Sequence, residues 1–551
     1  MNKIEALKAE KDGLEIQDDL VRFAREGWKT IGDDDKERLK WVGVFMRRPT
    51  PGHAMMRIRM PNGVVSASQV RLLARLTRES GRTIADITTR QQLQLRWVTV
   101  ERVPEIMARL EAAGLSSLQT GMDNIRGIIG CPATGLTPGE LIDTAPIARE
   151  FQRIFLGNKE FTNLPRKFNV TITGCREHCT GGETQDISMT PALAEIAAGE
   201  VAGFNLAVGG KQGSGGPTVA QPLDAFVRPE EAAEVCAAIA LIFRDFGPRE
   251  SRSKSRLAFL LGEWGADRFR KELEARLVRA LPRAGSDARG ATHSDHIGVF
   301  RQRQPGLNYV GLKTPVGRVT ADQLDELARL ADSYGRGELR FMPSQDVLLP
   351  HVPDARLGDL TQEPLVKELP YNPSEVRRGL VSCTGTDFCN LALIDTKTRA
   401  MALAKDFEKH VGRTRPITVR WSGCPASCAN HHTADIGLQG CKVRADGKIV
   451  DGVHIFVGGR GGQDPRAGTR IMEDVPCDEL PQVLERLIRF FPRPERQAPP
   501  PDSPSGPPDS PSGPPDSPLP PPDSPLPSPD SPSGPPDSPL PPPESPSKVS
   551  P

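Results

Sequence analysis

The sequence predicts an α+β protein whose body is a duplication with pseudo-two-fold symmetry, followed by a disordered proline-rich tail. In the body, VSASQVRLLARL at Val65–Leu76 matches VTADQLDELARL at Val319–Leu330, an offset of 254 residues. A second kind of segment, which contains cysteines, repeats at an offset near 250 residues. Because the two kinds of segment occur in the order A-B-A′-B′, each half of the body contains one copy of both.

The A segments predict a helix between two strands. Each helix begins with a capping box, Ser66-x-x-Gln69 in the first copy and Thr320-x-x-Gln323 in the second. Apolar residues then recur at helical spacing: Val70, Leu73, Ala74 and, in the second copy, Leu324, Leu327, Ala328, Ala331. A strand is expected on either side of each helix, so each copy predicts a β-α-β half-unit.

The B segments align cysteines of the two halves. NVTITGCREHC resembles TVRWSGCPASC, and RGIIGC resembles RGLVSC. The aligned pairs are Cys131 with Cys383, Cys175 with Cys424, and Cys179 with Cys428. Only the second half has a fourth cysteine, Cys389, where the first half has Thr137. We therefore expect the first-half cysteines to be relics of the duplication or to line a pocket.

The four second-half cysteines are typical ligands of an iron–sulfur cluster. Cys383 and Cys389 form C-x5-C, and Cys424 and Cys428 form C-x3-C. Four thiolates of this kind suit a [4Fe-4S] cluster. Structural zinc is the alternative, but its cysteine pairs usually have the spacing C-x2-4-C, and a five-residue gap falls outside that range.

Basic and polar residues are expected to line one face of three strands, because side chains alternate between the two faces of a strand. They are Arg57 and Arg59 in MMRIRM, Arg90, Gln94 and Arg96 in TTRQQLQLRWV, and Lys167 and Asn169 in PRKFNVTITG, with Arg126 as a further cation. A solvated strand face is the alternative for any single strand. Three such strands beside a metal centre instead favour binding of carboxylates or a small oxyanion. In two glycine-rich loops, Lys211 and Arg460 occupy matching places for an anionic cofactor.

Composition narrows the possible partners and the compartment. The 551-residue chain has no run of about 18 apolar residues, so no membrane span is expected. Its ten cysteines, without an export signal, favour reduced thiols in the cytoplasm. The tail from Ala498 repeats D-S-P every seven residues and carries a net charge of −6, which leaves +7 on residues 1–497. This modest excess does not indicate nucleic acid and suits an acidic partner or an anionic ligand.

Together these motifs resemble the sulfite/nitrite reductase family, in which a [4Fe-4S] cluster is paired with siroheme. The similarity runs from about residue 45 to 490 and is marked by the cysteine pairs, TTRQ and LPRKFN. It implies two ferredoxin-like half-units and two siroheme/Fe-S α/β domains. The expected divisions are an N-terminal helical arm at 1–45, half-unit 1 at 46–115, siroheme-binding domain 1 at 116–289, half-unit 2 at 290–365, cluster and siroheme domain 2 at 366–497, and the tail at 498–551.

The resemblance also implies roles for individual residues. Cys383, Cys389, Cys424 and Cys428 would hold the cluster, and Cys428 would bridge it to the siroheme iron. Siroheme carries eight carboxylates, and the residues expected to contact it are Arg90, Gln94, Arg166 and Lys211. The residues expected around the open iron face, where substrate binds, are Arg57, Arg126, Lys167 and Asn169.

The LPRKFN motif favours nitrite as the substrate. Sulfite reductases tend to have a second lysine where this chain has Asn169. One cation fewer favours a monoanion over a dianion. The expected activity is assimilatory reduction of nitrite to ammonium by a monomer in a bacterial or cyanobacterial cytoplasm, with electrons from reduced ferredoxin or a flavodoxin-like donor. The alternatives are sulfite reduction, a precorrin-3B synthase-like oxygenase, and a non-catalytic electron carrier.

Overall fold

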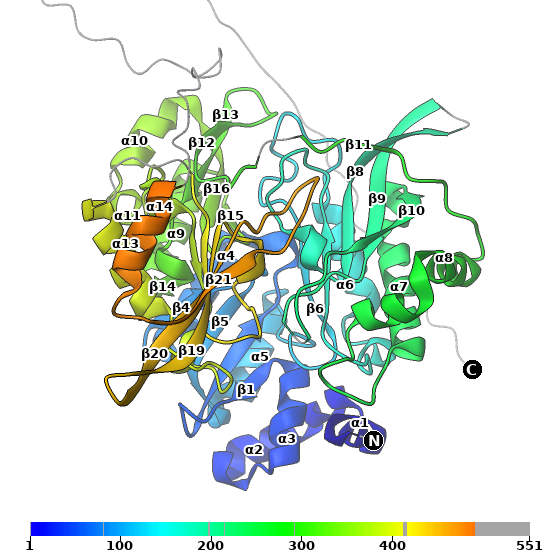
Figure 1. Cartoon of the computed structure of the whole chain (residues 1–551), viewed down its shortest axis with the longest axis horizontal. Coiled ribbons are helices and arrows are strands. Elements are labelled where there is room, and N and C mark those ends of the chain that lie inside the picture. The colour runs from blue at the N-terminus through cyan, green and yellow to red at the C-terminus, as the bar shows by residue number, and fades with distance from the viewer. Residues whose placement is uncertain are drawn as a thin grey trace, which may run out of the picture. The chain divides into compact units, whose positions relative to one another are not determined.

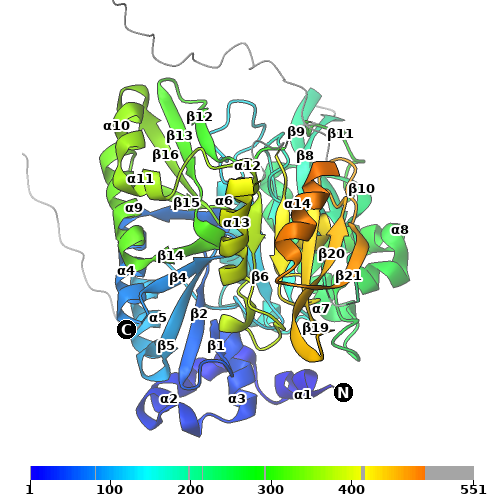
Figure 2. The ribbon, with the colours of Figure 1, turned by 60° about the vertical axis from the view of Figure 1, so that its left-hand side comes forward.

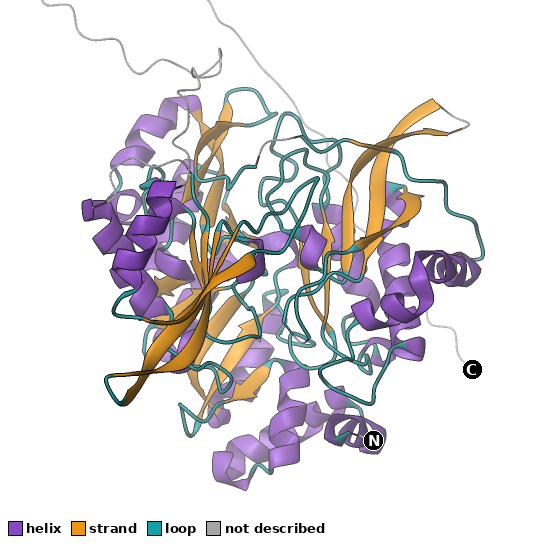
Figure 3. Cartoon of the chain, viewed as in Figure 1, coloured by secondary structure: helices purple, strands orange, loops and turns teal. Residues whose placement is uncertain are grey.

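Four β-sheets and their covering helices make up the body of the protein (Figures 1 and 3). The computed structural model describes residues 2–80, 82–196, 199–213, 215–290, 293–410 and 416–490. The proline-rich tail predicted from residue 498 lies outside the described residues. Each half contributes one antiparallel and one mixed sheet, which confirms the predicted α+β duplication.

The A segments build two antiparallel sheets of the same design. The first has the order β1 (Val44–Met46), β2 (His53–Ile58), β5 (Leu93–Thr99), β4 (Ile84–Ile87), β14 (Arg318–Thr320). The second has the order β12 (Gly298–Arg301), β13 (Leu307–Leu312), β16 (Val347–Pro353), β15 (Glu338–Phe341), β3 (Val64–Ser66).

Each of these sheets takes its last strand from the other half of the chain. β14, from the second half, pairs with β4, and β3, from the first half, pairs with β15. The two strands that flank each repeated helix therefore belong to different sheets. The expected strand on either side of each helix is confirmed. The sequence did not indicate that the two strands join different sheets, because a strand's hydrogen-bonding partner is set by the whole fold and not by local sequence.

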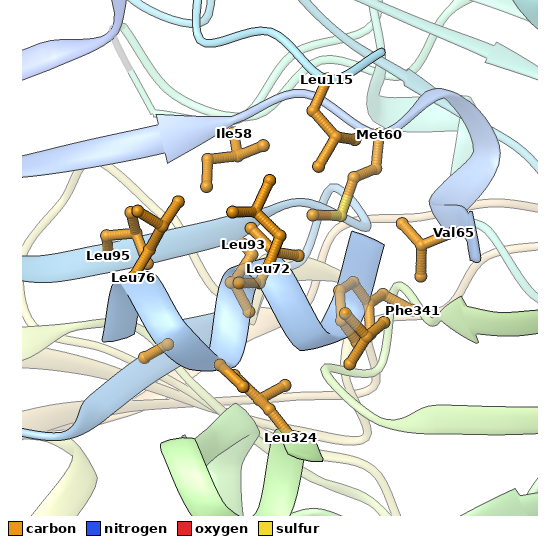
Figure 4. Packing of buried hydrophobic residues seen from close by; sticks show 14 of the residues in the cluster. Ile58, Met60, Val65, Leu72, Leu76, Leu93, Leu95, Leu115, Leu324 and Phe341 are labelled. Carbon is orange, nitrogen blue, oxygen red and sulfur yellow. The ribbon is translucent and has the colours of Figure 1, made fainter. Parts of the chain in front are cut away.

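The repeated helices meet at the centre of this exchange. Both α4 (Ala67–Glu79) and α9 (Ala321–Tyr334) begin with the predicted capping box, and they pack against each other. Figure 4 shows Leu72 and Leu76 of α4 in one buried cluster with Leu93 and Leu95 of β5 and Leu324 of α9. Shorter helices complete these units: α5 (Val103–Ala112), α10 (Leu357–Gln362) and α11 (Pro364–Glu368).

The B segments build two mixed sheets with one shared topology. The first runs β6 (Ile125–Ile129), β7 (Phe168–Ile172), β8 (Ile187–Ile196), β9 (Gly199–Val208), β10 (Gln221–Val227), with β11 (Ser286–Asp287) paired to β8. The second runs β17 (Leu380–Ser382), β18 (Val419–Ser422), β19 (Ile436–Ala445), β20 (Lys448–Val457), β21 (Thr469–Pro476). In both, the first three strands are parallel and the remaining pairs antiparallel.

Helices cover these two sheets. Those of the first half are α6 (Ala145–Phe155), α7 (Ala232–Phe246) and α8 (Leu257–Leu277), and those of the second are α12 (Glu375–Arg378), α13 (Lys397–His410) and α14 (Leu480–Phe490). Apolar residues of α13 and α14 share a buried cluster with β18, β19 and β20, and Figure 2 shows the two helices beside this sheet.

An N-terminal arm packs against the first half. It contains α1 (Lys3–Glu10), α2 (Leu20–Glu26) and α3 (Asp33–Arg38). Lys8 of α1 donates to the carbonyl oxygen of Leu164 (2.9 Å), just before the LPRKFN strand. Among the described residues, none of the helices combines the length and hydropathy needed to cross a bilayer.

Candidate functional site

The four second-half cysteines lie at one edge of their sheet. Cys383 follows β17 and Cys424 follows β18, and these two strands are parallel, so their carboxyl ends meet at the same edge. All four cysteines are free thiols. The backbone N–H of Gly423 donates to Sγ of Cys383 (3.1 Å), a contact that favours the thiolate form needed of a metal ligand.

The four sulfurs lie close enough together for the charge of one to change the pKa of another. Burial, followed by the charge of Cys428, raises the pKa of Cys383 to about 11, and burial together with the other three thiols raises that of Cys424 to about 12. The four groups are thus close enough to interact. Yet in the described part of the chain, compact sets of three or more potential ligand atoms within 4.8 Å include none of these four. Tetrahedral zinc would hold its sulfurs about 3.8 Å apart.

Four basic side chains of the first half face this cysteine edge. Arg57 is in β2, Arg90 precedes β5, Arg126 is in β6, and Lys167 precedes β7. Burial, then repulsion from Arg90, lowers the pKa of Arg57 to about 9. Burial and neighbouring arginines also hold the pKa values of Arg126 and Lys167 well below normal, while the charge of Cys428 opposes the shift for Lys167. The first-half cations and the last second-half cysteine therefore share one site.

The cations of this site have unused hydrogen-bonding capacity. Arg57 donates one N–H to the carbonyl oxygen of Thr120 (2.9 Å), but its buried Nε has no partner. Nε of Arg126 donates to the carbonyl oxygen of Met122 (2.7 Å). The Lys167 ammonium makes no hydrogen bond or ion pair with the residues that the structure describes. The four cations are half-buried, and charges withdrawn from water are normally paired, so this arrangement fits a ligand that carries several negative charges.

Asn169 is positioned to orient one of the cations. It is buried, and its side-chain oxygen accepts from Nε of Arg90 (2.9 Å). Its backbone N–H donates to the carboxylate of Asp186 (2.9 Å), which also pairs with Arg256 (2.7 Å). A Cβ at Gly127 would come within 3.3 Å of the Arg90 side chain, so glycine leaves the room that Arg90 occupies.

Two residues of the predicted strand face have partners inside the protein. The side-chain oxygen of Gln94 accepts from Arg96 (2.6 Å), and Arg96 also pairs with buried Asp86. Arg59, predicted to share a face with Arg57, donates to carbonyl oxygens of residues 118 and 119, next to Thr120, which accepts from Arg57. β2 ends at Ile58, and Arg59 is buried and also donates to the backbone carbonyl oxygen of Ile125.

Arg166 and Lys211 lie at the margin of the cation group. Burial, followed by repulsion from Arg252, lowers the pKa of Arg166 to about 10, and its charge in turn lowers the pKa of Arg126. The Lys211 ammonium bonds the carbonyl oxygen of Gly216 in its own loop and lies 5.1 Å from the centre of the Phe259 ring. Arg460, its predicted counterpart, pairs with Asp464.

Sequence reasoning missed the acidic residues that anchor the back of the site. Asp186 is fully buried and pairs with Arg256, and Asp123 accepts two hydrogen bonds from Arg252 (2.5 and 2.9 Å). Lys8 of the N-terminal arm lies 3.4 Å from Asp123. The sequence signal was the basic run RESRSKSR at 249–256, and nothing local indicates which acidic residue each of its arginines pairs with.

A glutamine that occurs in both A segments, at the same offset of 254 residues, joins the A and B units of each half. Gln91 and Gln345 both have left-handed φ values, 58° and 71°. The side-chain oxygen of Gln91 accepts from the N–H of Gly130 (3.0 Å), and that of Gln345 accepts from Ser382 (3.0 Å). These are the residues before Cys131 and Cys383, so each glutamine fixes a strand end that carries a cysteine.

Two family models match most of the folded chain. The nitrite and sulphite reductase 4Fe-4S domain matches residues 121–281 and 375–499. The nitrite/sulfite reductase ferredoxin-like half domain matches residues 46–113 and 300–366. Each model therefore matches once in each half, as the duplication requires.

Individual relatives match along nearly their whole length. The ferredoxin–nitrite reductase of Synechococcus elongatus is 45% identical over 495 residues, which cover 89% of this chain and 96% of the relative. The chloroplastic ferredoxin–nitrite reductase of Spinacia oleracea is 40% identical, with 90% and 87% covered. The solved structure of Mycobacterium tuberculosis NirA protein matches with a TM-score of 0.84 at 33% identity, covering 90% of this chain and 95% of that one.

Proposed function

Because the chain belongs to the nitrite and sulphite reductase family, we propose that it reduces nitrite to ammonium with electrons from reduced ferredoxin. The observation that carries the proposal is the meeting of Arg57, Arg90, Arg126 and Lys167 with the cysteine edge at Cys428. A simple electron carrier would need the cysteines alone. The relatives that match over most of this chain are named ferredoxin–nitrite reductases.

The proposed cofactors are a [4Fe-4S] cluster and siroheme. Cys383, Cys389, Cys424 and Cys428 would hold the cluster, with Cys428 shared with the siroheme iron. Gln94 and the basic residues Arg90, Arg166 and Lys211 would hold the carboxylates of the macrocycle. When bound, the two groups supply one-electron transfer to a substrate nitrogen. The protein supplies position, charge and protons.

Arg57, Arg126 and Lys167 are proposed to bind the substrate anion. Their positive charge stabilises negative charge on the nitrite oxygens, and Lys167, which has no other partner among the described residues, can donate a proton as an oxygen leaves as water. Eight protons and six electrons convert nitrite to ammonium and two water molecules. Asn169 takes part by holding Arg90 and adds no charge of its own.

The proposal also covers the electron donor, the oligomeric state and the cellular compartment. Residues 1–497 carry a net charge of +7, which suits an acidic ferredoxin. The cations and the cysteines come from one chain, so the site is complete in a monomer. We place this monomer in the cytoplasm of a bacterium or cyanobacterium, and cyanobacterial relatives support that placement.

Sulfite reduction is the second candidate, because the family models cover both activities. The neutral side chain of Asn169 favours the nitrite assignment. The test is kcat/KM for nitrite and for sulfite with one common reductant, together with the visible spectrum of the purified protein. A siroheme spectrum and preference for nitrite are expected. Equal or better reduction of sulfite would overturn the assignment, and a spectrum of a bare cluster would exclude a siroheme enzyme.

A further inference from the structure

A second group of cysteines lies in the first half, at the positions equivalent to the cluster ligands. Cys131 follows β6 and Cys175 follows β7, and both are fully buried. Cys179 lies beside them, as does the imidazole of buried His296, which comes from the segment before β12. Position 137, where the second half has its fourth cysteine, is Thr137. His296, from elsewhere in the chain, joins the three cysteines instead.

The distances between potential ligand atoms in this group are close to those around a single bound metal ion. Sγ of Cys131 lies 3.4 Å from Nε2 of His296. The ligand atoms of Cys131, Cys179 and His296 all lie within 4.8 Å of one another. The thiol of Cys131 also contacts that of Cys175, which lies outside this compact set, so the Cys175 side chain would turn toward the other three to become the fourth ligand. In tetrahedral zinc sites, Zn–S of about 2.3 Å and Zn–N of about 2.0–2.1 Å put ligand atoms about 3.5–3.8 Å apart. Among the described residues, the compact sets of potential ligand atoms include none of the second-half cysteines.

The surroundings of the group match those of a structural metal site. Nδ1 of His296 contacts the hydroxyl of buried Tyr309 (3.1 Å), which leaves Nε2 directed at Cys131. Such a second contact normally orients a metal-binding histidine. The N–H of Glu177 donates to Sγ of Cys175 (3.4 Å). Apolar side chains enclose the rest of the group: Ala133, Leu136, Ile297, Met342 and Leu348.

A route to solvent is also present. Cys179 and His296 line a pocket that opens to solvent, so an ion can enter without unfolding of the core. We propose that Cys131, Cys175, Cys179 and His296 bind one zinc ion. The set is Cys3His, one of the usual ligand sets of structural zinc, and it leaves no open position for substrate. The ion joins the ends of β6 and β7 to the segment that leads into β12 and the second half.

The test begins with the unmodified holoenzyme. Metal analysis by mass spectrometry is expected to find one zinc per chain in addition to iron, and absorption at the zinc K edge is expected to fit three sulfurs and one nitrogen. Protein without zinc after growth in zinc-supplemented medium would overturn the proposal. A disulfide among the three cysteines would also overturn it, as would iron in the amount of a second cluster.

Substitutions test whether these residues bind the ion. C131S and H296Q should each lose the zinc while keeping the iron of the second half, and C175S should lower the sulfur count at the zinc edge. The matched control is C236S, because Cys236 is equally buried but lies in α7 away from this group. Equal zinc content in C131S, H296Q and C236S would overturn the assignment. If C131S does not fold, H296Q and the edge spectrum still decide the question.

Discussion

The two halves contain equivalent sites that differ in their charged residues. At the first, cations of the first half face cysteines of the second. In the equivalent site of the other half, the aligned sequences show which residues correspond to these cations. They are Gly311 for Arg57, Ser344 for Arg90, Pro416 for Lys167 and Arg378 for Arg126. Ser344, Pro416 and Cys179 line the same pocket. The frame of the site is thus duplicated, whereas three of its four cations are present only once.

The one cation that both sites retain is used differently. Arg378 makes two hydrogen bonds to the carboxylate of Asp295 (2.5 and 2.8 Å), and Glu375 lines the same pocket. Nε of Arg126 instead donates to a backbone carbonyl oxygen, and neighbouring cations lower its pKa. Asp295 neutralises the positive charge of Arg378, whereas the charge of Arg126 is left for the proposed ligand. Specialisation after duplication therefore changed the charge more than the fold.

The largest difference is expected between Cys428 and its counterpart Cys179. C428S should lose nitrite reduction and the electronic coupling of the two cofactors, because a hydroxyl is a poor ligand for two irons. C179S should keep both, because its sulfur belongs to the first-half group. Activity and electron paramagnetic resonance spectra of the two variants provide the measurement. Loss of the cluster in C179S with retention in C428S would reverse the assignment of the halves.

The retained arginines offer a matched pair of substitutions. R126M removes an unneutralised charge from the proposed substrate site, so kcat/KM for nitrite should fall by about 10² to 10³, the usual loss for one stabilising donor. R378M removes an arginine that Asp295 already neutralises, and its kcat/KM should stay within a few-fold of the parent. The comparison fails if both variants lose activity equally while holding normal iron and siroheme.

N169K should give a smaller change in substrate preference. The new ammonium removes the acceptor of Arg90 and adds charge beside it, which favours a dianion over a monoanion. One charge pair at about 4 Å is worth roughly 4 kcal/mol at an effective dielectric near 20, but screening and the burial of lysine remove much of this. The ratio of kcat/KM for sulfite to that for nitrite should rise by tens-fold or less. An unchanged ratio would show that charge at this position does not set the preference.

The smallest effect is expected from substitution of His431, a buried histidine of the second half. Burial lowers the pKa of His431 to about 3, so between about pH 6.5 and 4 the unfolded chain binds a proton that the folded chain does not. Stability should therefore fall as the pH falls through this window. In H431Q the melting temperature should fall by about 1 to 3 °C less than in the parent over the same window. If the melting temperatures of the parent and of H431Q changed with pH in the same way, keeping His431 neutral would cost the folded protein no stability.

Sequence reasoning succeeded where the signal is local or repeated. The capping boxes at Ser66 and Thr320 begin the two helices, and the cysteine spacing agrees with the matched 4Fe-4S domain. It did not reveal the exchange of β3 and β14 or the pairing of Asp186 with Arg256. These partners are 70 or more residues apart in the chain, and no local pattern encodes them.

The exchanged strands β3 and β14 make the body a covalent version of a domain-swapped dimer. If the chain were divided between β11 and β12, each fragment would lack the edge strand that completes its antiparallel sheet and would expose the unpaired backbone of β4 or β15. The fragments should therefore reassemble with each other or aggregate. Neither half can evolve toward independence without first rebuilding an edge, and this mutual dependence keeps the cations of one half facing the cysteines of the other.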